Sequence, residues 1–260
     1  MAFILMKLIY RFPVTPNQVS FLSMLTGIIS GIFYTKGNVA SFVYAGLLYG
    51  FAHVLDCCDG MVARFKKSGT HTGRIIDGLA DYVNSTAVFI GLGIGLSKSG
   101  LEFPVSPWLL VIFSAMFTAL HCIIVDYYRN EFLAHAFGKV NSVQEDMELF
   151  SMELKKLKQV KGKYFEKLLI KLYLLYSDIQ VFKGSEKRKY DQEKYYRSNK
   201  MLLYSWLLIG PTAHISVLVI STILYKPFIF FYYVLIAANI LMLLIWVIQV
   251  QINKKICLEY

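Results

Sequence analysis

The sequence predicts an all-α integral membrane protein with six membrane-spanning helices, an N-terminal interfacial helix and a cytoplasmic helical insertion. The first indication is composition, because 56% of the 260 residues are hydrophobic and only 17% are charged. A soluble domain carries about 25% charged residues, so an ordinary soluble protein is excluded. The second indication is that the apolar residues gather in six runs. Each run is close to the roughly 20 residues that a helix needs to cross a bilayer.

The N-terminal stretch, residues 2–12, is bulky and apolar but carries Lys7 and Arg11. Lys7 interrupts the apolar run and no small-residue cleavage site follows, which argues against a signal peptide. A helix that lies on the membrane surface explains both features. Pro13 and Pro16 end this helix, and Asn17 can begin the next one.

The spans divide one membrane domain, residues 1–260, into four parts. These are the interfacial helix (1–16), four spans with the active site (17–128), a basic helical insertion (129–200) and two last spans (201–252). Gly210-Pro211 predicts a kink in the fifth span. The six spans themselves are expected at 18–34, 40–59, 75–96, 108–128, 201–224 and 228–250.

Basic residues are distributed unevenly among the loops, and this predicts the orientation. They are abundant in 64–74, 129–200 and Lys254-Lys255, whereas the other loops hold only Lys36, Lys98 and Lys226. Cytoplasmic loops carry the excess of Lys and Arg, so both termini and the active site are expected on the cytoplasmic side. This distribution, with attraction to anionic lipid headgroups, also explains the formal charge of +10 without a nucleic-acid partner. Within 152–176, apolar residues recur near helical spacing, which predicts helices with one face on the membrane or the core.

Residues 56–81 concentrate acidic side chains at one end of the second and third spans. Asp56 and Asp59 are spaced i,i+3 and Asp77 and Asp81 are spaced i,i+4, so on helices each pair shares a face. The polar interruption at 64–74 would turn the chain so that the two faces meet. Buried carboxylates require neutralising cations, and oxygen ligands suit Mg²⁺ or Mn²⁺ better than zinc. Two such ions would form a clamp suited to phosphoryl chemistry.

These residues resemble the full signature of the CDP-alcohol phosphatidyltransferases, also called CDP-alcohol phosphotransferases. The match is Asp56-x2-Asp59-Gly60-x2-Ala63-Arg64-x8-Gly73-x3-Asp77-x3-Asp81. The resemblance implies that Asp56, Asp59 and Asp77 are the principal metal ligands. It implies that Asp81 is the general base and also touches a metal. It further implies a CDP site in which Gly60 and Ala63 let the nucleotide approach the helix, and to which Asp56, Arg64, Gly73 and Asp77 contribute.

The resemblance implies an enzyme of phospholipid biosynthesis that moves a substituted phosphate from a CDP-alcohol to the hydroxyl of an acceptor alcohol and releases CMP. The favoured branch uses CDP-diacylglycerol as donor and a polar alcohol as acceptor, because the short six-span chain resembles the compact prokaryotic members. The alternative branch transfers phosphocholine or phosphoethanolamine from CDP-choline or CDP-ethanolamine to diacylglycerol. Membrane lipid is a partner in either branch, and a homodimer is the family expectation.

Four further residues are weaker candidates for binding the acceptor. Arg129 and Lys139 follow the fourth span and suit an anionic acceptor, although loops on the cytoplasmic side carry such residues anyway. His121 and His214 lie in spans, where ionisable groups are candidates for function, but a packed, hydrogen-bonded histidine is equally compatible.

Two other interpretations stay open at this stage. An ion transporter would also place aspartates in spans, but it would spread them along the membrane depth and would leave Gly60, Ala63, Arg64 and Gly73 without a role. A catalytically silent scaffold would have no reason to keep a complete metal set.

Overall fold

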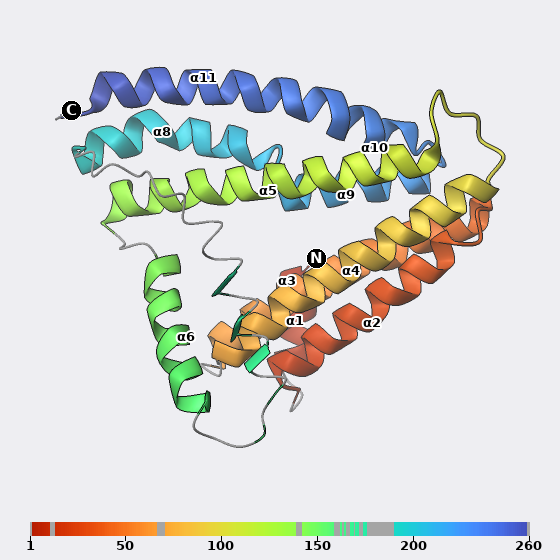
Figure 1. Cartoon of the computed structure of the whole chain (residues 1–260), viewed down its shortest axis with the longest axis horizontal. Coiled ribbons are helices and arrows are strands. Elements are labelled where there is room, and N and C mark those ends of the chain that lie inside the picture. Colours follow the sequence, from red (N-terminus) through yellow and green to blue (C-terminus); the bar gives the residue numbers. More distant parts are fainter. Residues whose placement is uncertain are drawn as a thin grey trace. The chain divides into compact units, whose positions relative to one another are not determined.

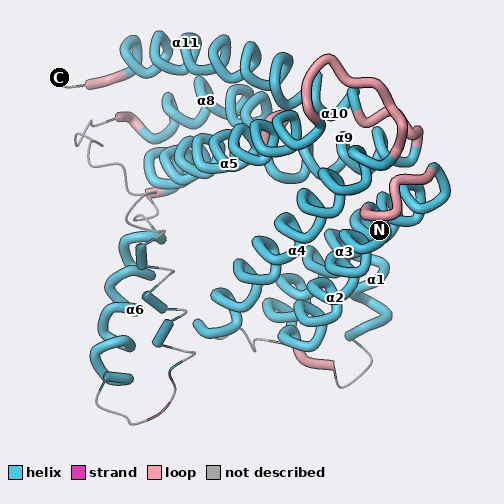
Figure 2. The backbone as a smooth tube through the Cα atoms, turned by 45° about the vertical axis from the view of Figure 1, so that its right-hand side comes forward, coloured by secondary structure: helices cyan, strands magenta, loops and turns pink. Residues whose placement is uncertain are grey.

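The computed structural model describes residues 2–10, 14–66, 71–138, 142–158 and 190–258, together with 162, 164, 167–168, 170–171 and 174–175. Within these residues the chain is built from helices and has no β-strand, only an isolated bridge between Tyr190 and Cys257 (Figures 1 and 2). The prediction of an all-α protein is confirmed.

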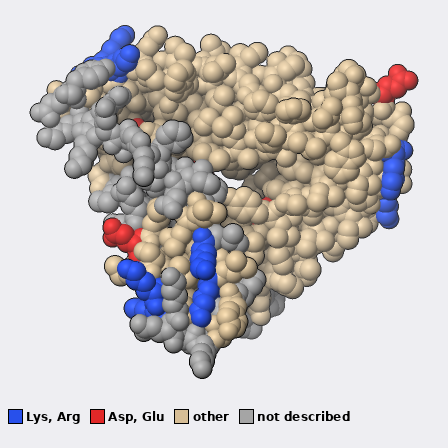
Figure 3. All heavy atoms as spheres, in the orientation of Figure 1, with Lys and Arg blue, Asp and Glu red and all other residues tan. Residues whose placement is uncertain are grey.

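Five stretches among the described residues are long and apolar enough to cross a membrane, and they correspond to the second to sixth expected spans. On the face drawn in Figure 3, charged side chains occupy only small areas, as expected of a surface that faces lipid. The chain is therefore an integral, multi-pass membrane protein. The five stretches are Val39–Phe65, Asp77–Lys98, Pro107–Phe137, Gln192–Ile223 and Phe228–Ile256.

The expected first span is present as helix α2 (Pro16–Tyr34) but is not one of these five stretches. Its buried face carries Ser20, Ser23, Thr26 and Ser30, which lower its mean hydropathy. The count of six spans therefore stays a prediction.

The chain divides into two compact units, which we describe separately. The first unit comprises Met1–Phe117 and His214–Ile236, and the second comprises Thr118–Ala213 and Ala237–Tyr260. The expected division of one membrane domain into four consecutive parts stays a prediction.

In the first unit, α1 (Ala2–Tyr10) packs on α3 (Val39–Phe65). Met6 is buried against Leu55 and Cys58, and the Cys58 thiol donates to the carbonyl oxygen of Ala2 over 3.1 Å. Phe3 remains 54% exposed on α1. An apolar side chain outside the packed face agrees with the expected position of this helix at the membrane surface.

Helix α2 packs against both α3 and α4 (His71–Lys98), as Figures 1 and 2 show. Its start is fixed by Thr15, whose side chain caps the helix and whose N–H donates to Gln18 over 3.0 Å. Its serines bind α3 directly: Ser23 donates to the carbonyl oxygen of Ala52 over 2.9 Å and Ser30 to that of Ala45 over 2.7 Å. In a membrane the hydrophobic effect does not drive helices together, so hydrogen bonds of this kind help to hold them in contact.

Glycines allow α2 and α4 to approach closely. A Cβ placed on Gly91 of α4 would overlap the backbone of Gly31 on α2, and one placed on Gly95 would overlap the carbonyl oxygen of Tyr34. This small-residue contact fixes the rotation of α4 against α2. It therefore also fixes the direction in which the acidic start of α4 points.

The remaining helices of the first unit are α9 (Pro211–Ile223), α10 (Phe228–Tyr232) and the π-helical turn η1 (Tyr233–Ala237). Thr222 of α9 accepts a 3.0 Å hydrogen bond from the Tyr34 hydroxyl of α2. Tyr34 and Phe42 belong to the main apolar core of this unit, which also includes Leu218 and Phe230.

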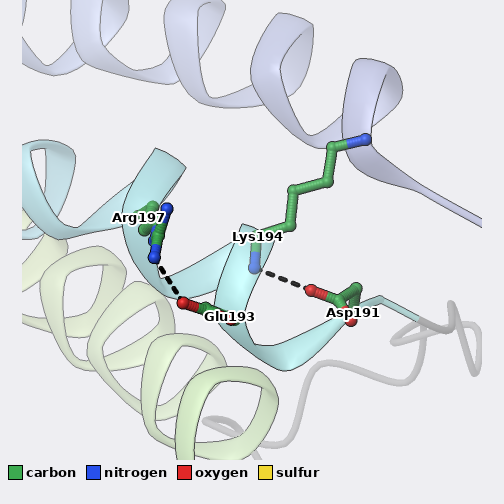
Figure 4. A network of polar contacts seen from close by, with 4 residues as sticks. All are labelled: Asp191, Glu193, Lys194 and Arg197. Atoms are coloured by element: carbon green, nitrogen blue, oxygen red, sulfur yellow. Dashed lines mark hydrogen bonds and ion pairs between the residues drawn. The ribbon is translucent and has the colours of Figure 1, made fainter.

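The second unit includes α6 (Ser142–Lys158), α8 (Gln192–Leu207) and α11 (Ala238–Ile256), and α5 (Pro107–Phe137) runs into it. Buried amides join α8 to α11: Gln249 donates to Asn199 over 2.5 Å and accepts from the Trp206 indole over 3.2 Å. Figure 4 shows the start of α8, where Asp191 caps the helix through the Lys194 N–H and Arg197 pairs with Glu193.

The long helices extend into the expected insertion at 129–200. Helix α5 continues to Phe137 and α8 already begins at Gln192, so both ends of that segment are helical continuations of spans. At the expected kink, a turn at 208–210 interrupts the helix and separates α8 from α9, and the bend itself stays a prediction. Most of the helical pattern expected after residue 158 lies outside the described residues.

Candidate functional site

The four aspartates meet where the end of α3 lies beside the start of α4. Asp56, Asp59 and Asp77 each present a carboxylate oxygen, and these oxygens lie within 4.8 Å of one another. Asp81, one turn further along α4, lies within hydrogen-bonding reach of Asp56. We call these four residues the aspartate cluster.

The aspartate cluster has the properties of a cation site. Three carboxylates at this spacing, with a fourth beside them, repel one another strongly, because charges within a few ångströms interact strongly wherever water is scarce. Asp59 is only 3% exposed, and Oδ1 of Asp56 is buried with no hydrogen-bond partner in the part of the chain that the structure describes. An orphaned carboxylate oxygen beside two further carboxylates matches the oxygen-only ligand set that hard divalent cations prefer. These residues therefore fit a divalent metal ion.

Ser20 is a member of this site that sequence reasoning missed. Its hydroxyl, on α2, donates to Oδ2 of Asp59 and lies 3.2 Å from the carbonyl oxygen of Pro16. A hydrogen bond of this kind orients a metal-binding carboxylate. The only signal in the sequence is a serine in an apolar span, which on its own does not identify a partner.

The surface of α3 beyond the carboxylates is open. Among the described residues, a Cβ placed on Gly60 would meet only Nη2 of Arg64, at 3.8 Å, so their packing does not require glycine here. Arg64 is exposed and folds back along its own helix, where Nε donates to the carbonyl oxygen of Gly60 over 3.0 Å. Ala63 is partly exposed, and Gly73 lies in the first turn of α4. The CDP-binding roles of these residues stay predictions.

Three of the four weaker candidates, Arg129, His121 and His214, lie in the described part of the chain. Arg129 pairs with Asp126 of its own helix at 3.2 Å, and its side chain is 54% exposed. His121 is fully buried in α5 and hydrogen-bonded to Asn239. His214 is 2% exposed.

Of these, only His214 belongs to the same unit as the aspartate cluster, and its ring lies 5.3 Å from that of Tyr233. Lys139 lies outside the described residues. The acceptor-binding roles of Arg129, Lys139, His121 and His214 stay predictions.

Comparison with known proteins shows which family the chain belongs to. Residues 13–162 match the family model described as CDP-alcohol phosphatidyltransferase, and this range contains the whole aspartate cluster. No solved structure matches the chain significantly.

Three curated relatives are similar over part of the chain. A bifunctional IPC transferase and DIPP synthase of Archaeoglobus fulgidus is 31% identical over 134 residues, which are 48% of this chain and 23% of the relative. The protein of the same name from Thermococcus kodakarensis is 29% identical over 137 residues, 51% of this chain and 28% of the relative. A CDP-diacylglycerol–inositol 3-phosphatidyltransferase of Candida albicans is 30% identical over 79 residues, 30% of this chain and 33% of the relative. The matches thus span about a quarter to a third of the length of these relatives.

Proposed function

Since this chain belongs to the CDP-alcohol phosphatidyltransferase family, we propose that it transfers a phosphatidyl group from CDP-diacylglycerol to the hydroxyl of a polar acceptor alcohol and releases CMP. The observation that carries this proposal is the aspartate cluster, in which three carboxylates lie within 4.8 Å of one another and Asp81 lies beside them. The name of the Candida albicans relative, which specifies CDP-diacylglycerol, supports this donor over CDP-choline or CDP-ethanolamine.

Asp56, Asp59 and Asp77 would hold Mg²⁺ or Mn²⁺, with Asp81 at the edge of the same site. Two bound ions would offset the charge of the donor diphosphate and stabilise the departing CMP. Ser20 keeps the carboxylate of Asp59 in place for this task through its hydrogen bond. The buried, unpartnered Oδ1 of Asp56 supports the metal assignment.

Asp81 would act as the general base in this reaction. It is the exposed member of the cluster, whereas Asp59 is buried and already accepts a hydrogen bond. An acceptor alcohol can therefore reach Asp81, which removes the hydroxyl proton as the oxygen attacks the phosphorus bonded to the diacylglycerol oxygen. The phosphoanhydride bond to CMP breaks, and CMP leaves with the electron pair of that bond.

The open face at Gly60 and Ala63 provides space for the CDP group. Arg64 lies over Gly60 with its guanidinium exposed, so it can turn to a phosphate of the nucleotide and form charge-assisted hydrogen bonds. Gly73 would complete this region from the start of α4. Arg129 and Lys139 are the candidates for an anionic acceptor, and a cytoplasmic active site and a homodimer complete the proposal.

The test is a donor panel with the purified protein in detergent, Mg²⁺ or Mn²⁺ and phospholipid extract. CDP-diacylglycerol is supplied with a series of polar alcohols, and CDP-choline or CDP-ethanolamine is supplied with diacylglycerol. We expect CMP release from CDP-diacylglycerol, abolished by chelator, with one alcohol required. Release from CDP-choline or CDP-ethanolamine alone would replace the proposal by an aminoalcohol transferase. Absence of release from every donor would contradict the enzyme assignment and leave the ion-transport interpretation to be tested.

A further inference from the structure

One half-buried histidine, which precedes the aspartate cluster by one turn of α3, has no role in the proposed reaction so far. His53 lies on α3, one turn before Asp56, and its Nε2 is buried with no hydrogen-bond partner among the described residues. Buried polar atoms in native proteins normally have partners, so an orphaned imidazole nitrogen requires an explanation. The orphaned Oδ1 of Asp56 has a ready explanation as a metal ligand, whereas the nitrogen of His53 does not.

Helical register places His53 on the substrate side of α3. Each residue rotates by about 100°, so His53 lies about 60° from Asp56 and only about 20° from Gly60 around the axis. Gly60 is the position where the helix surface is open. His53, Asp56 and Gly60 therefore form one stripe, with the metal-binding carboxylate in the middle.

The two ends of this stripe face different parts of a lipid donor. Gly60 lies toward the end of α3, where Arg64 and the charged residues gather, and His53 lies about 4.5 Å from Asp56 along the axis toward the middle of the span. A donor whose diphosphate lies at the aspartate cluster must direct its nucleotide to the polar end. Its acyl chains must run the other way, into the apolar part of the span. The glycerol esters, which connect the two, then lie at the level of His53.

We propose that His53 is a positioning residue whose Nε2–H donates a hydrogen bond to an ester carbonyl oxygen of CDP-diacylglycerol. A neutral imidazole with its proton on Nε2 is a donor at that atom, and an ester carbonyl is an acceptor without a donor of its own. The inference rests on the proposed function, because it requires a lipid donor with its diphosphate at the aspartate cluster. It adds a contact by which the enzyme recognises the lipid half of its substrate.

The test compares three ligands and three substitutions. The ligands are CDP-diacylglycerol, its diether analogue CDP-dialkylglycerol, which has no ester carbonyl, and CMP. His53→Leu removes the donor and keeps an apolar side chain. His53→Gln places an amide near the former Nε2, and His53→Asn places it too close to the backbone to reach. Binding to the full-length protein is measured by displacement of a fluorescent CMP analogue, with CMP release recorded alongside.

Wild-type protein is expected to bind the diester about tenfold more tightly than the diether, a difference of about 1.4 kcal/mol. His53→Leu and His53→Asn should lose this preference, with unchanged affinity for the diether and for CMP. His53→Gln should retain it. Phe51→Leu is the control, since Phe51 is 48% exposed and points about 160° away from His53. If His53→Leu or His53→Asn fails to fold, the other still decides by comparison with His53→Gln, because His53→Gln alone keeps a donor within reach of the ester.

Equal weakening for all three ligands would overturn the inference and assign His53 to the nucleotide or metal part of the site. Unchanged binding in every variant would overturn it as well. Failure of the proposed function is recognised separately, because wild-type protein would then release no CMP from CDP-diacylglycerol in the donor panel. With that release established, loss of ester selectivity in the His53 variants tests the inference alone.

Discussion

Individual carboxylates of the aspartate cluster have distinct environments, and the roles proposed for them rest on these differences. Asp59 is buried and anchored by Ser20, Asp56 has a buried free oxygen, and Asp81 is exposed beside it. Charge alone would make the four residues equivalent. These differences support the proposal that Asp56 and Asp59 bind metal and that Asp81 acts on the acceptor.

Asp81→Asn tests the assignment of the general base. The amide keeps the size of the side chain but cannot take a proton, so turnover should fall by about 10²–10⁴-fold. CMP release is measured at saturating metal and donor, with the thermal melting profile as the control for folding. Turnover close to wild type, from a protein with an unchanged melting profile, would remove Asp81 from this role.

Ser20→Ala tests whether the hydroxyl on α2 supports metal binding. Loss of the hydrogen bond frees the Asp59 carboxylate to rotate, so the Mn²⁺ concentration for half-maximal activity should rise by about 10–100-fold. Ser23→Ala is the matched control, since it loses a bond to the backbone of Ala52 without touching an aspartate. Equal metal requirements in the two variants would show that Ser20 serves helix packing only.

At the scale of elements, the cluster depends on how closely α4 approaches α2. The contact between Gly91 and Gly31 sets the rotation of α4, and this rotation turns Asp77 toward α3. The carboxylates of two helices can meet only because the third helix, α2, holds both of them. The site is therefore a property of the three-helix group and not of the signature residues alone.

Gly91→Ala tests this dependence. The added methyl group would overlap backbone atoms of Gly31, which cannot move aside as a side chain can, so both the melting temperature and CMP release should fall. In Gly50→Ala the methyl group meets only Val219 at 3.5 Å, an ordinary contact, and better helix propensity should leave stability equal or higher. A melting temperature for Gly91→Ala as high as that of Gly50→Ala would contradict the close contact.

The sequence predicted most of the elements but not their ends. Helix α5 continues to Phe137 and α8 starts at Gln192 because helices extend beyond the apolar part of a span, and hydropathy does not register that extension. The capping residue Asp191 is a local signal for the start of α8. It lies, however, within 129–200, which its basic residues assigned to a cytoplasmic insertion and not to the fifth span. The π-helical turn at Tyr233–Ala237 has no recognisable signal in the sequence.

The site was predictable to the extent that it depends on local spacing. Asp56 with Asp59, and Asp77 with Asp81, follow from helical periodicity, and their proximity follows from the turn between the helices. The bond from Ser20 to Asp59 joins residues 39 positions apart. It depends on how α2 packs against α3, which no spacing within either helix specifies.

At the scale of the whole molecule, the distribution of Lys and Arg predicts which ends of the helices face the cytoplasm. Single cysteines at Lys98 and Lys254, both exposed, test this prediction in a background without the native cysteines. A membrane-impermeant thiol reagent applied to intact cells should label Lys98→Cys, whereas Lys254→Cys should be labelled only after permeabilisation. The opposite labelling pattern would reverse the orientation.

The central claim is that the aspartate cluster binds the divalent ions on which CMP release depends. Its most direct test is the titration of chelator-treated wild-type protein with Mn²⁺, with bound ions counted by electron paramagnetic resonance and CMP release recorded on the same samples. We expect two bound ions per chain and activity that rises with their occupancy. Asp77→Asn should bind Mn²⁺ at least about tenfold more weakly. Full CMP release from metal-free protein, or equal Mn²⁺ binding by wild type and Asp77→Asn, would contradict the account.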